Sequence, residues 1–224
     1  MSTALVCSSH SPLLYCYDKP PQEWDAIQAA FQTSRDFVEA FNPELVFIFG
    51  TDHFNGFFLN TMPAFCVGLA ANAAADIGGF TGAIDVPENT AMQAIEYLRA
   101  NGLDPAVSYQ MTIDHGFSQT LQLMTGGLDA VPTIPIFINC ITRPFVPFER
   151  TILLGNKLGK FAKSLNKRVL FLASGGMSHH PTRYYPAFGE GEVEVMAWQL
   201  SGGKDPQSMS PEQWLERLDS MHHE

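Results

Sequence analysis

The stretch ELVFIFGTDH, residues 44–53, decides the fold. Its apolar run, VFIF, places large side chains on both faces of an extended chain, which is typical of a strand buried in a mostly parallel sheet. Asp52 and His53 follow directly, so an ionisable pair stands where this strand should end. In open α/β sheets, ligands bind outside the carboxyl ends of the strands. The stretch therefore predicts a buried strand with a polar site at its end.

The rest of the chain alternates between strand and helix patterns. Short apolar runs predict strands at residues 4–8, 44–50, 64–69, 106–110, 133–140 and 168–173. Helical patterns, some of them weaker, predict helices at residues 22–41, 88–100, 116–124, 148–164, 193–200 and 211–222. The small, Gly-rich segment 72–82 is expected to be a loop or lid. This alternation predicts an α/β fold with a mostly parallel sheet and helices on both of its faces.

Length and composition indicate one globular domain spanning residues 1–224. The chain has 224 residues, of which 46% are apolar and 16% charged, enough to bury a substantial core. Its net charge is −10 and it contains no run of Lys or Arg, which argues against nucleic acid as a partner. It shows no signal-peptide pattern and no apolar stretch long enough to span a membrane. The four cysteines are dispersed, as expected of reduced thiols, so a cytoplasmic protein is expected.

The histidines gather after the predicted strands. Five of the seven do so: His10, His53, His115, His179 and His180. The other two lie in the terminal SMHHE and are expected to be solvated. A single histidine after a strand is usually explained by a local hydrogen bond. Because histidines follow four strands here, we expect their imidazoles to converge in one crevice. Small polar neighbours could orient those imidazoles: Ser8, Ser9, Asp52, Asp114 and Ser178.

Two kinds of metal chemistry fit such a crevice. Two imidazoles and one carboxylate form the facial triad that holds Fe(II) in non-haem oxygenases, and the remaining histidines could act as acid and base. The same residue types could hold Zn2+ for hydrolysis, and composition leaves both readings open.

The sequence contains no motif of a competing enzyme class: no GxGxxG after a strand, no Walker A motif, no HExxH and no GxSxG elbow.

Five motifs together carry a resemblance to a known family. They are SHSPL (9–13), DHFNGFF (52–58), DHGF (114–117), GGLDAVPTIPIFIN (126–139) and LNKRVLFLASGGMSH (165–179). In these motifs the chain resembles the class III (LigB-type) extradiol catechol dioxygenases, in particular the enzymes for 2,3-dihydroxyphenylpropionate and 2,3-dihydroxycinnamate. The resemblance implies a LigB-like fold, an Fe(2+) cofactor and meta cleavage of a small aromatic diol by O2. The implied product is a 2-hydroxy-6-oxo-dienedioate, formed in aromatic catabolism.

The resemblance also implies roles for four histidines. His10, in SHSP, and His53, in DHFNG, match the positions of the family's iron ligands. His115, in DHGF, matches the proton donor, and His179, in GGMSH, matches the proton acceptor. The family also implies a homo-oligomer.

The C-terminal part matches the family only loosely. The family's carboxylate iron ligand comes from that part, and the chain is expected to lack the corresponding segment. Five acidic residues are available there, but a solvated acidic face is the expected reading for them: Glu190, Glu192, Glu194, Glu212 and Glu216.

The substrate pocket and the exact reaction stay open at this level. Arg143, Arg183 and Lys167 are unranked candidates for binding a substrate carboxylate. Four aromatic residues could flank a catechol ring, although core packing is the commoner role: Phe54, Phe57, Phe58 and Phe117. The alternatives are a metal hydrolase, a LigB-like dioxygenase for an aminophenol or protocatechuate-type ring, and a non-catalytic metal- or ligand-binding domain.

Overall fold

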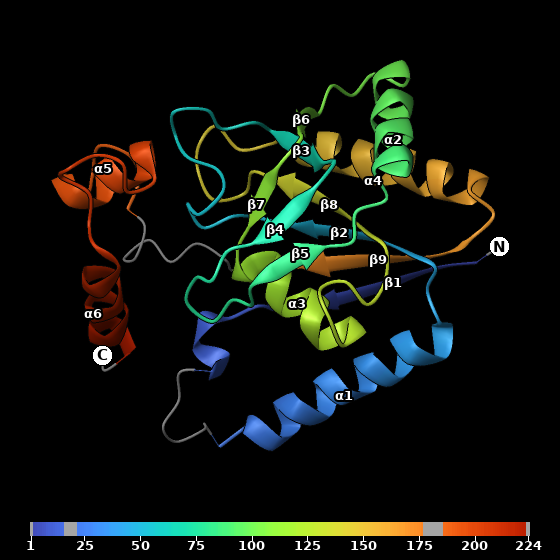
Figure 1. Cartoon of the computed structure of the whole chain (residues 1–224), viewed down its shortest axis with the longest axis horizontal. Helices are drawn as coiled ribbons and strands as arrows, with labels where there is room; N and C mark the ends of the chain where they lie inside the picture. The colour runs from blue at the N-terminus through green and yellow to red at the C-terminus, as the bar shows by residue number, and fades with distance from the viewer. Residues whose placement is uncertain (1, 16–21, 177–185, 223–224) are drawn as a thin grey trace.

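A six-stranded, mainly parallel sheet forms the centre of the molecule (Figure 1). The computed structural model describes residues 2–15, 22–176 and 186–222. The strand order is β1 (Ser2–Ser8), β9 (Arg168–Ser174), β2 (Leu45–Gly50), β8 (Thr133–Ile138), β3 (Phe65–Gly68) and β6 (Ala106–Ser108). All neighbours pair in parallel except β3 and β8, which are antiparallel. The predicted mostly parallel sheet is therefore confirmed.

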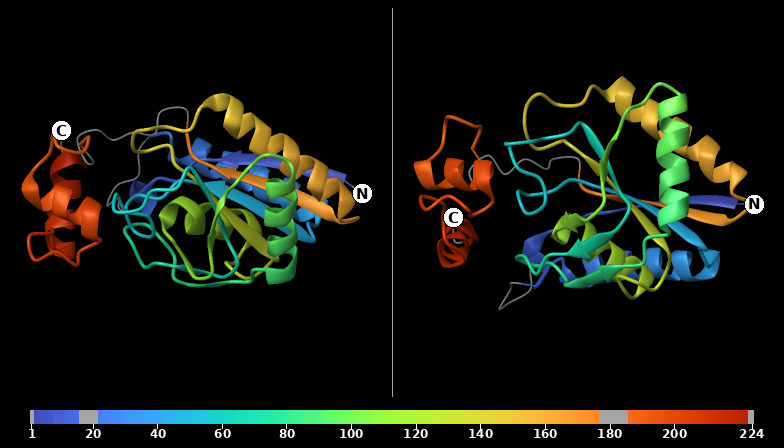
Figure 2. Two further views of the ribbon diagram at one scale, coloured as in Figure 1. Left: turned by 90° about the horizontal axis from the view of Figure 1, so that it is seen from above. Right: turned by 45° about the horizontal axis from the view of Figure 1, so that its top comes forward.

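Helices cover both faces of this sheet, as the sequence predicted (Figure 2). One face carries α1 (Trp24–Phe41) and α3 (His115–Thr125), and the other carries α2 (Glu88–Ala100) and α4 (Phe148–Ser164). Strand β2 shows why both faces need a cover: successive side chains of a strand point to opposite faces, and those of β2 are apolar on both. Val46 and Ile48 lie in the core beneath α1 and α3, whereas Leu45 and Phe47 lie in the core beneath α2 and α4. Both sets are fully buried.

A small second sheet lies on the α3 side of the molecule. It consists of β5 (Gly82–Ile84), β4 (Ala71–Ala73) and β7 (Met111–Ile113). The prediction of a continuous loop at residues 72–82 was wrong at both ends, because β4 and β5 take its first and last residues. The strand that precedes His115 is β7, so it belongs to this small sheet and not to the central one. Three-residue strands are too short to show a periodic pattern in the sequence.

The remaining helices lie beyond the carboxyl ends of the central strands. The short helix η1 (Pro12–Tyr15) follows β1, and α5 (Val193–Ser201) and α6 (Pro211–His222) come last. Figure 1 shows α5 and α6 at the end of the molecule toward which β1, β9, β2 and β8 point. Their packing forms a third core cluster, in which Trp214 and Val195 join Phe54 and Ile141 from the loops after β2 and β8.

Local sequence signals explain where the helices near the site begin and end. Asp114 caps α3 by accepting a hydrogen bond from the backbone N–H of Gly116, and Gly126 ends that helix in the left-handed conformation. Asn42, which precedes a proline, ends α1 with a left-handed φ of 50°. Among the described residues, every helix is too short or too polar to cross a membrane.

Candidate metal centre

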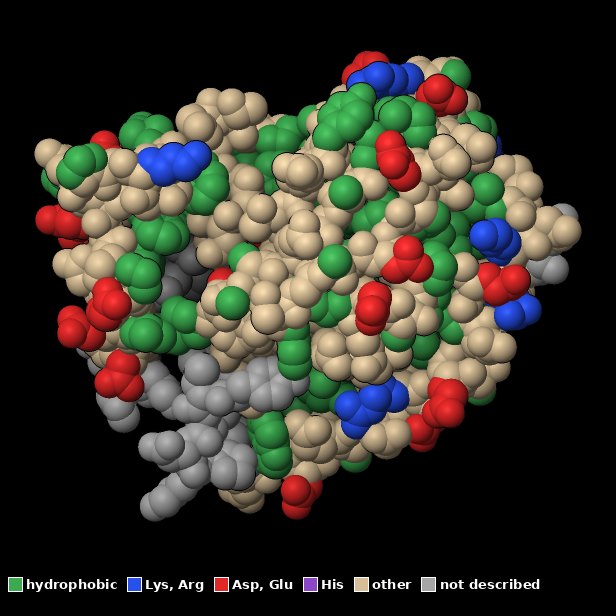
Figure 3. Space-filling model, viewed as in Figure 1, with side chains coloured by type: hydrophobic (Ala, Val, Ile, Leu, Met, Phe, Trp, Pro, Cys, Tyr) green, Lys and Arg blue, Asp and Glu red, His purple; other side chains and the backbone are tan. Residues whose placement is uncertain are grey.

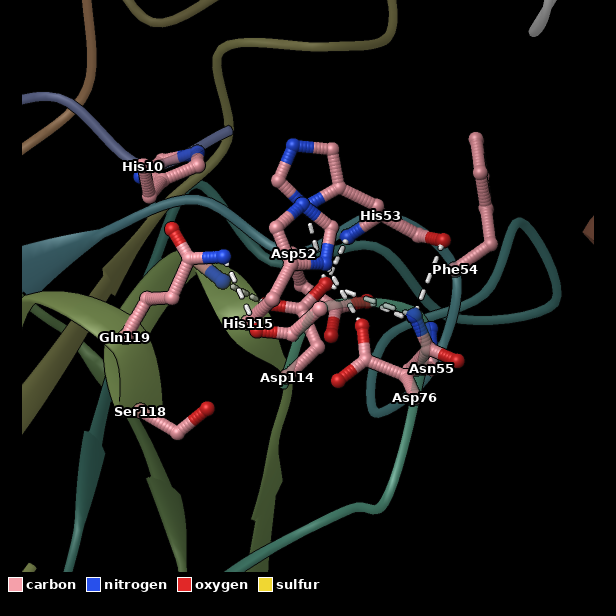
Figure 4. A network of polar contacts seen from close by, with 12 residues as sticks. His10, Asp52, His53, Phe54, Asn55, Asp76, Asp114, His115, Ser118 and Gln119 are labelled. Atoms are coloured by element: carbon pink, nitrogen blue, oxygen red, sulfur yellow. Dashed lines mark hydrogen bonds and ion pairs between the residues drawn. The ribbon is translucent and has the colours of Figure 1, made fainter. Parts of the chain in front are cut away.

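Three buried imidazoles meet at the carboxyl edge of the sheet. His10 follows β1, His53 follows β2 and His115 is the first residue of α3. The ring nitrogens that they offer as ligands all lie within 4.8 Å of one another. The ring centroids of His53 and His115 are 4.2 Å apart and nearly stacked, and that of His10 is 5.2 Å from His53 (Figure 4). Each residue is only 6% exposed, so the predicted convergence of these three histidines is observed.

The imidazole of His53 is held by Asp114. Oδ2 of Asp114 lies 2.9 Å from Nδ1 of His53 and accepts the backbone N–H of His53 at 2.7 Å, while Oδ1 accepts the N–H of Gly116. Burial alone would raise the pKa of Asp114, but the imidazoles of His53 and His115 and the hydrogen bonds from His53 hold it below its ordinary value. Asp114 is therefore a carboxylate anion that orients one imidazole and caps the helix beginning with another.

The imidazole of His10 is held by hydroxyl groups instead. Its Nδ1 lies 2.6 Å from Oγ of Ser174, the last residue of β9, and that Oγ lies 2.7 Å from Oγ1 of the fully buried Thr120. The neighbours of His10 and His53 therefore differ in charge, although both engage Nδ1. In each ring, a metal ion would bind Nε2, because Nδ1 is engaged by an oxygen.

The imidazole of His115 has its own carboxylate partner. Its Nδ1 lies 2.6 Å from Oδ2 of Asp76, which comes from the loop between β4 and β5. Burial alone would lower the pKa of His115, but the carboxylates of Asp114 and Asp76 raise it above its ordinary value. His115 is thus favoured in its protonated form.

Asp52 shapes the loop after β2, and its hydrogen bonds with the described residues come from backbone N–H groups and not from an imidazole. Its carboxylate accepts the backbone N–H groups of Asn55, Gly56 and Phe57. Burial and the nearby Asp114 carboxylate raise the pKa of Asp52, against the effect of these three N–H groups. Asp52 was expected to orient an imidazole, but in the structure its carboxylate holds the backbone of residues 55–57.

The α5–α6 unit contacts the loop that carries His53. Trp198 Nε1 donates to the backbone oxygen of Phe54 at 3.0 Å, and the N–H of Leu59 donates to the backbone oxygen of Gln199 at 2.7 Å. Phe54 is buried with a left-handed φ of 59°. The conformation next to His53 is therefore supported from the C-terminal helices.

Several residues singled out in the sequence are not part of this cluster. The five C-terminal glutamates are exposed, with Glu192 3.0 Å from Arg217, and none joins a potential metal site in the described part of the chain. Lys167 precedes β9 and so lies at the opposite end of the sheet, whereas Arg143 follows β8 at the site's edge. Phe117 lies in the core under α3 and Phe54 in the third cluster. His179, His180 and Arg183 lie outside the described residues.

The sequence did not single out Asp76, Ser174 or Gln119. Gln119 is fully buried and bridges two segments of the site: its Nε2 donates to the oxygens of Ser11 and Gly78, and its Oε1 accepts the N–H of Ser11. The sequence could have indicated a role for Gln119 only through its spacing, since residues four apart, such as His115 and Gln119, lie on the same face of a helix. Asp76 and Ser174 contact histidines that are distant in sequence, so no local sequence pattern indicates these contacts.

The donor set fits a transition-metal ion. Imidazole nitrogens suit iron and zinc, and the carboxylates next to them would offset the charge of a divalent cation. On the face shown in Figure 3, Lys and Arg side chains lie scattered among Asp and Glu, so no basic patch is seen there.

Most of the chain is similar to a known protein family and to its curated members. The family model described as the catalytic LigB subunit of aromatic ring-opening dioxygenase matches residues 4–218. A 2,3-dihydroxyphenylpropionate/2,3-dihydroxicinnamic acid 1,2-dioxygenase 2 of Pseudomonas putida is 46% identical over 181 residues, covering 81% of this chain and 58% of the relative. The corresponding 1,2-dioxygenase of Escherichia coli (strain K12 / DH10B) is 42% identical over 205 residues, covering 92% and 65%. The chain thus spans about three fifths of the length of these relatives.

Proposed function

Because the chain belongs to the LigB family of aromatic ring-opening dioxygenases, we propose that it cleaves a small catechol by extradiol (meta) ring opening with O2. The substrates proposed are 2,3-dihydroxyphenylpropionate and 2,3-dihydroxycinnamate, since the relatives are named for them. The observation that carries the proposal is the buried cluster of His10, His53 and His115, each with Nδ1 engaged by an oxygen. The product would be a 2-hydroxy-6-oxo-dienedioate.

The metal would be Fe(II), held by Nε2 of His10 and of His53. The family is metal-dependent, and two imidazoles next to a carboxylate are a donor set that suits Fe(II) as well as Zn2+. When bound, Fe(II) supplies open coordination positions and the one-electron chemistry that reaction with O2 requires. The buried position of both histidines supports the choice, because a low dielectric strengthens the interaction between the metal and an anionic catechol.

His115 would be the proton donor of the reaction. It must carry a proton at neutral pH, and the nearby carboxylates of Asp114 and Asp76 raise its pKa. Its ring lies 4.2 Å from that of His53, so a group bound at His53 is within reach of His115. His179 would take a phenolic proton from the catechol; its role rests on the GGMSH motif alone.

The test is O2 uptake after anaerobic loading of the chain with Fe(II), with 2,3-dihydroxyphenylpropionate as substrate. The expected result is uptake of O2 with a yellow ring-fission product, lost in His10→Ala and His53→Ala and kept in Glu212→Gln, an exposed control. Binding of the catechol without O2 uptake would support a non-catalytic binding domain instead. Activity with Zn2+ in the absence of O2 would support a hydrolase.

A further inference from the structure

We propose that Asp76 is a positioning residue that fixes the ring orientation of His115 and keeps its Nδ1 protonated. The reaction that His115 serves is taken from the proposed function. The contact between Asp76 and His115 is observed in the structure and does not depend on that function. Oδ2 of Asp76 lies 2.6 Å from Nδ1 of His115, across 39 residues of sequence. The two side chains are 9% and 7% exposed.

The contact determines which nitrogen of His115 faces the other imidazoles. An ionised carboxylate can only accept, so Nδ1 of His115 must carry the hydrogen in this pair. Nε2 is then the nitrogen directed at the substrate side of the cluster, and the ring cannot rotate without breaking a buried hydrogen bond. A proton donor needs this fixed orientation, because proton transfer requires hydrogen-bond reach to the reacting atom.

The loop that carries Asp76 is built around this contact. Gly78 has a left-handed φ of 72°, and a Cβ at Gly79 would collide with Oδ1 of Asp76. The N–H of Gly79 donates to the backbone oxygen of Asp76 at 3.0 Å, which closes the turn. Only glycine allows both the turn and the close approach of the backbone to the carboxylate.

Helix α3, which carries His115, also holds this loop. Gln119 donates to the oxygen of Gly78 at 2.8 Å, and the hydroxyl of Ser118 accepts the N–H of Phe80 at 3.1 Å. Ala74 donates from its N–H to the oxygen of Ile113, just before α3, at 2.7 Å. The segments bearing Asp76 and His115 are thus tied together on both sides of the contact (Figure 4).

The second oxygen of Asp76 lowers the stability of the fold. Oδ1 is buried and has no hydrogen-bond partner among the described residues. A buried carboxylate oxygen without a partner costs free energy, and an apolar side chain of the same shape would avoid that cost. The fold therefore carries a cost at Oδ1, and the contact of Oδ2 with His115 is the reason that we infer for this carboxylate.

The first test measures whether Nδ1 of His115 carries a hydrogen, which does not depend on activity. Long-range 1H–15N correlation of the histidine rings in 15N-labelled protein with Zn2+ added should show His115 protonated at Nδ1, with its signals assigned by their loss in His115→Gln. Asp76→Leu should remove this preference, and the exposed control Asp129→Asn should keep it. A wild-type ring protonated only at Nε2, or an Nδ1 that stays equally protonated in Asp76→Leu, would overturn the proposal.

The second test is a double-mutant cycle on O2 uptake. Asp76→Leu should lower kcat roughly 10- to 100-fold with KM changed by less than about twofold, and Asp76→Asn, which keeps an acceptor oxygen, should recover part of the loss. In a His115→Gln background, Asp76→Leu should cause no further loss, because the residue that it positions is gone. An equal loss in both backgrounds would show a general structural effect and overturn the proposal. If the unsubstituted chain takes up no O2 with any catechol, the proposed function fails, and the measurement of the hydrogen on Nδ1 still decides the role of Asp76.

Discussion

Asp114 and His53 are joined twice: Oδ2 of the carboxylate accepts the backbone N–H of His53 at 2.7 Å and lies 2.9 Å from its ring Nδ1. One carboxylate thus fixes both the chain and the ring of a proposed metal ligand. Its other oxygen caps α3, which begins with His115. The position of the ligand and that of the proposed proton donor therefore depend on the same side chain.

We expect Asp114→Asn to weaken metal binding. The amide cannot supply the negative charge that strengthens the His53 imidazole as a ligand, so the affinity should fall roughly 10- to 100-fold. Titration with Fe(II) under anaerobic conditions measures this, and Asp129→Asn is the matched control because its carboxylate is exposed. Equal affinities in the wild type, Asp114→Asn and Asp129→Asn would show that the charge of Asp114 does not affect metal binding.

The same carboxylate should make the metal-free protein sensitive to acid. The folded-state pKa of Asp114 is lowered, so its contribution to the free energy of unfolding is fully present above its unfolded pKa of about 3.9. The contribution is lost as the pH falls from there through the lower folded pKa. Denaturant unfolding with a chelator present, between about pH 5 and pH 2, should show a shallower loss of stability in Asp114→Asn than in the wild type. Parallel curves for the two proteins would contradict this assignment.

The three clustered histidines could be predicted from the sequence because the rule that places them is local. An apolar run followed by a polar residue identifies the carboxyl end of a strand, and such ends meet at one edge of a sheet. His10 and His53 follow this rule directly after β1 and β2. His115 reached the same edge by another path, through β7 of the small sheet.

The groups that orient the histidines could not be predicted, because the contacts that define them are distant in sequence. Ser174 lies 164 residues from His10, and Asp76 lies 39 residues from His115. Asp76 stands in a segment of small residues without any periodic pattern, so nothing in its neighbourhood distinguishes it from a loop residue. The pairing of β4 with β7 brings its loop to α3.

The hydrogen bond from Trp198 to Phe54 should support the loop after β2. Trp198→Phe keeps most of the ring packing but leaves the oxygen of Phe54 without this donor, so the free energy of unfolding should fall by about 1–3 kcal/mol. Thermal or denaturant unfolding measures the change. Phe188→Leu, at an exposed aromatic position in the segment preceding α5, is the control and should change it little. A Trp198→Phe protein as stable as the wild type would mean that the oxygen finds another donor.

Of the two candidate cations in the described part of the chain, Arg143 is better placed than Lys167 to bind the carboxylate of the proposed phenylpropionate substrate. It follows β8, which runs parallel to β2, so its loop leaves the sheet at the same edge as His53. Ile141 of that loop packs in one cluster with Phe54, the residue after His53, and the guanidinium of Arg143 lies 5.3 Å from the ring centroid of Phe145. Lys167 lies before β9, at the far end of the same sheet.

Arg143→Gln should therefore raise KM for 2,3-dihydroxyphenylpropionate about 10-fold or more, because hydrogen bonds to charged groups contribute about 1.5–3 kcal/mol. A catechol without a carboxylate, such as 3-methylcatechol, should show the same KM in variant and wild type, since it has nothing for the guanidinium to bind. Lys167→Gln serves as the matched control and should leave both values unchanged. Steady-state O2 uptake with the two substrates gives all of these constants. If Arg143→Gln raised KM equally for both catechols, the arginine would be shaping the loop and the substrate carboxylate would have to bind elsewhere.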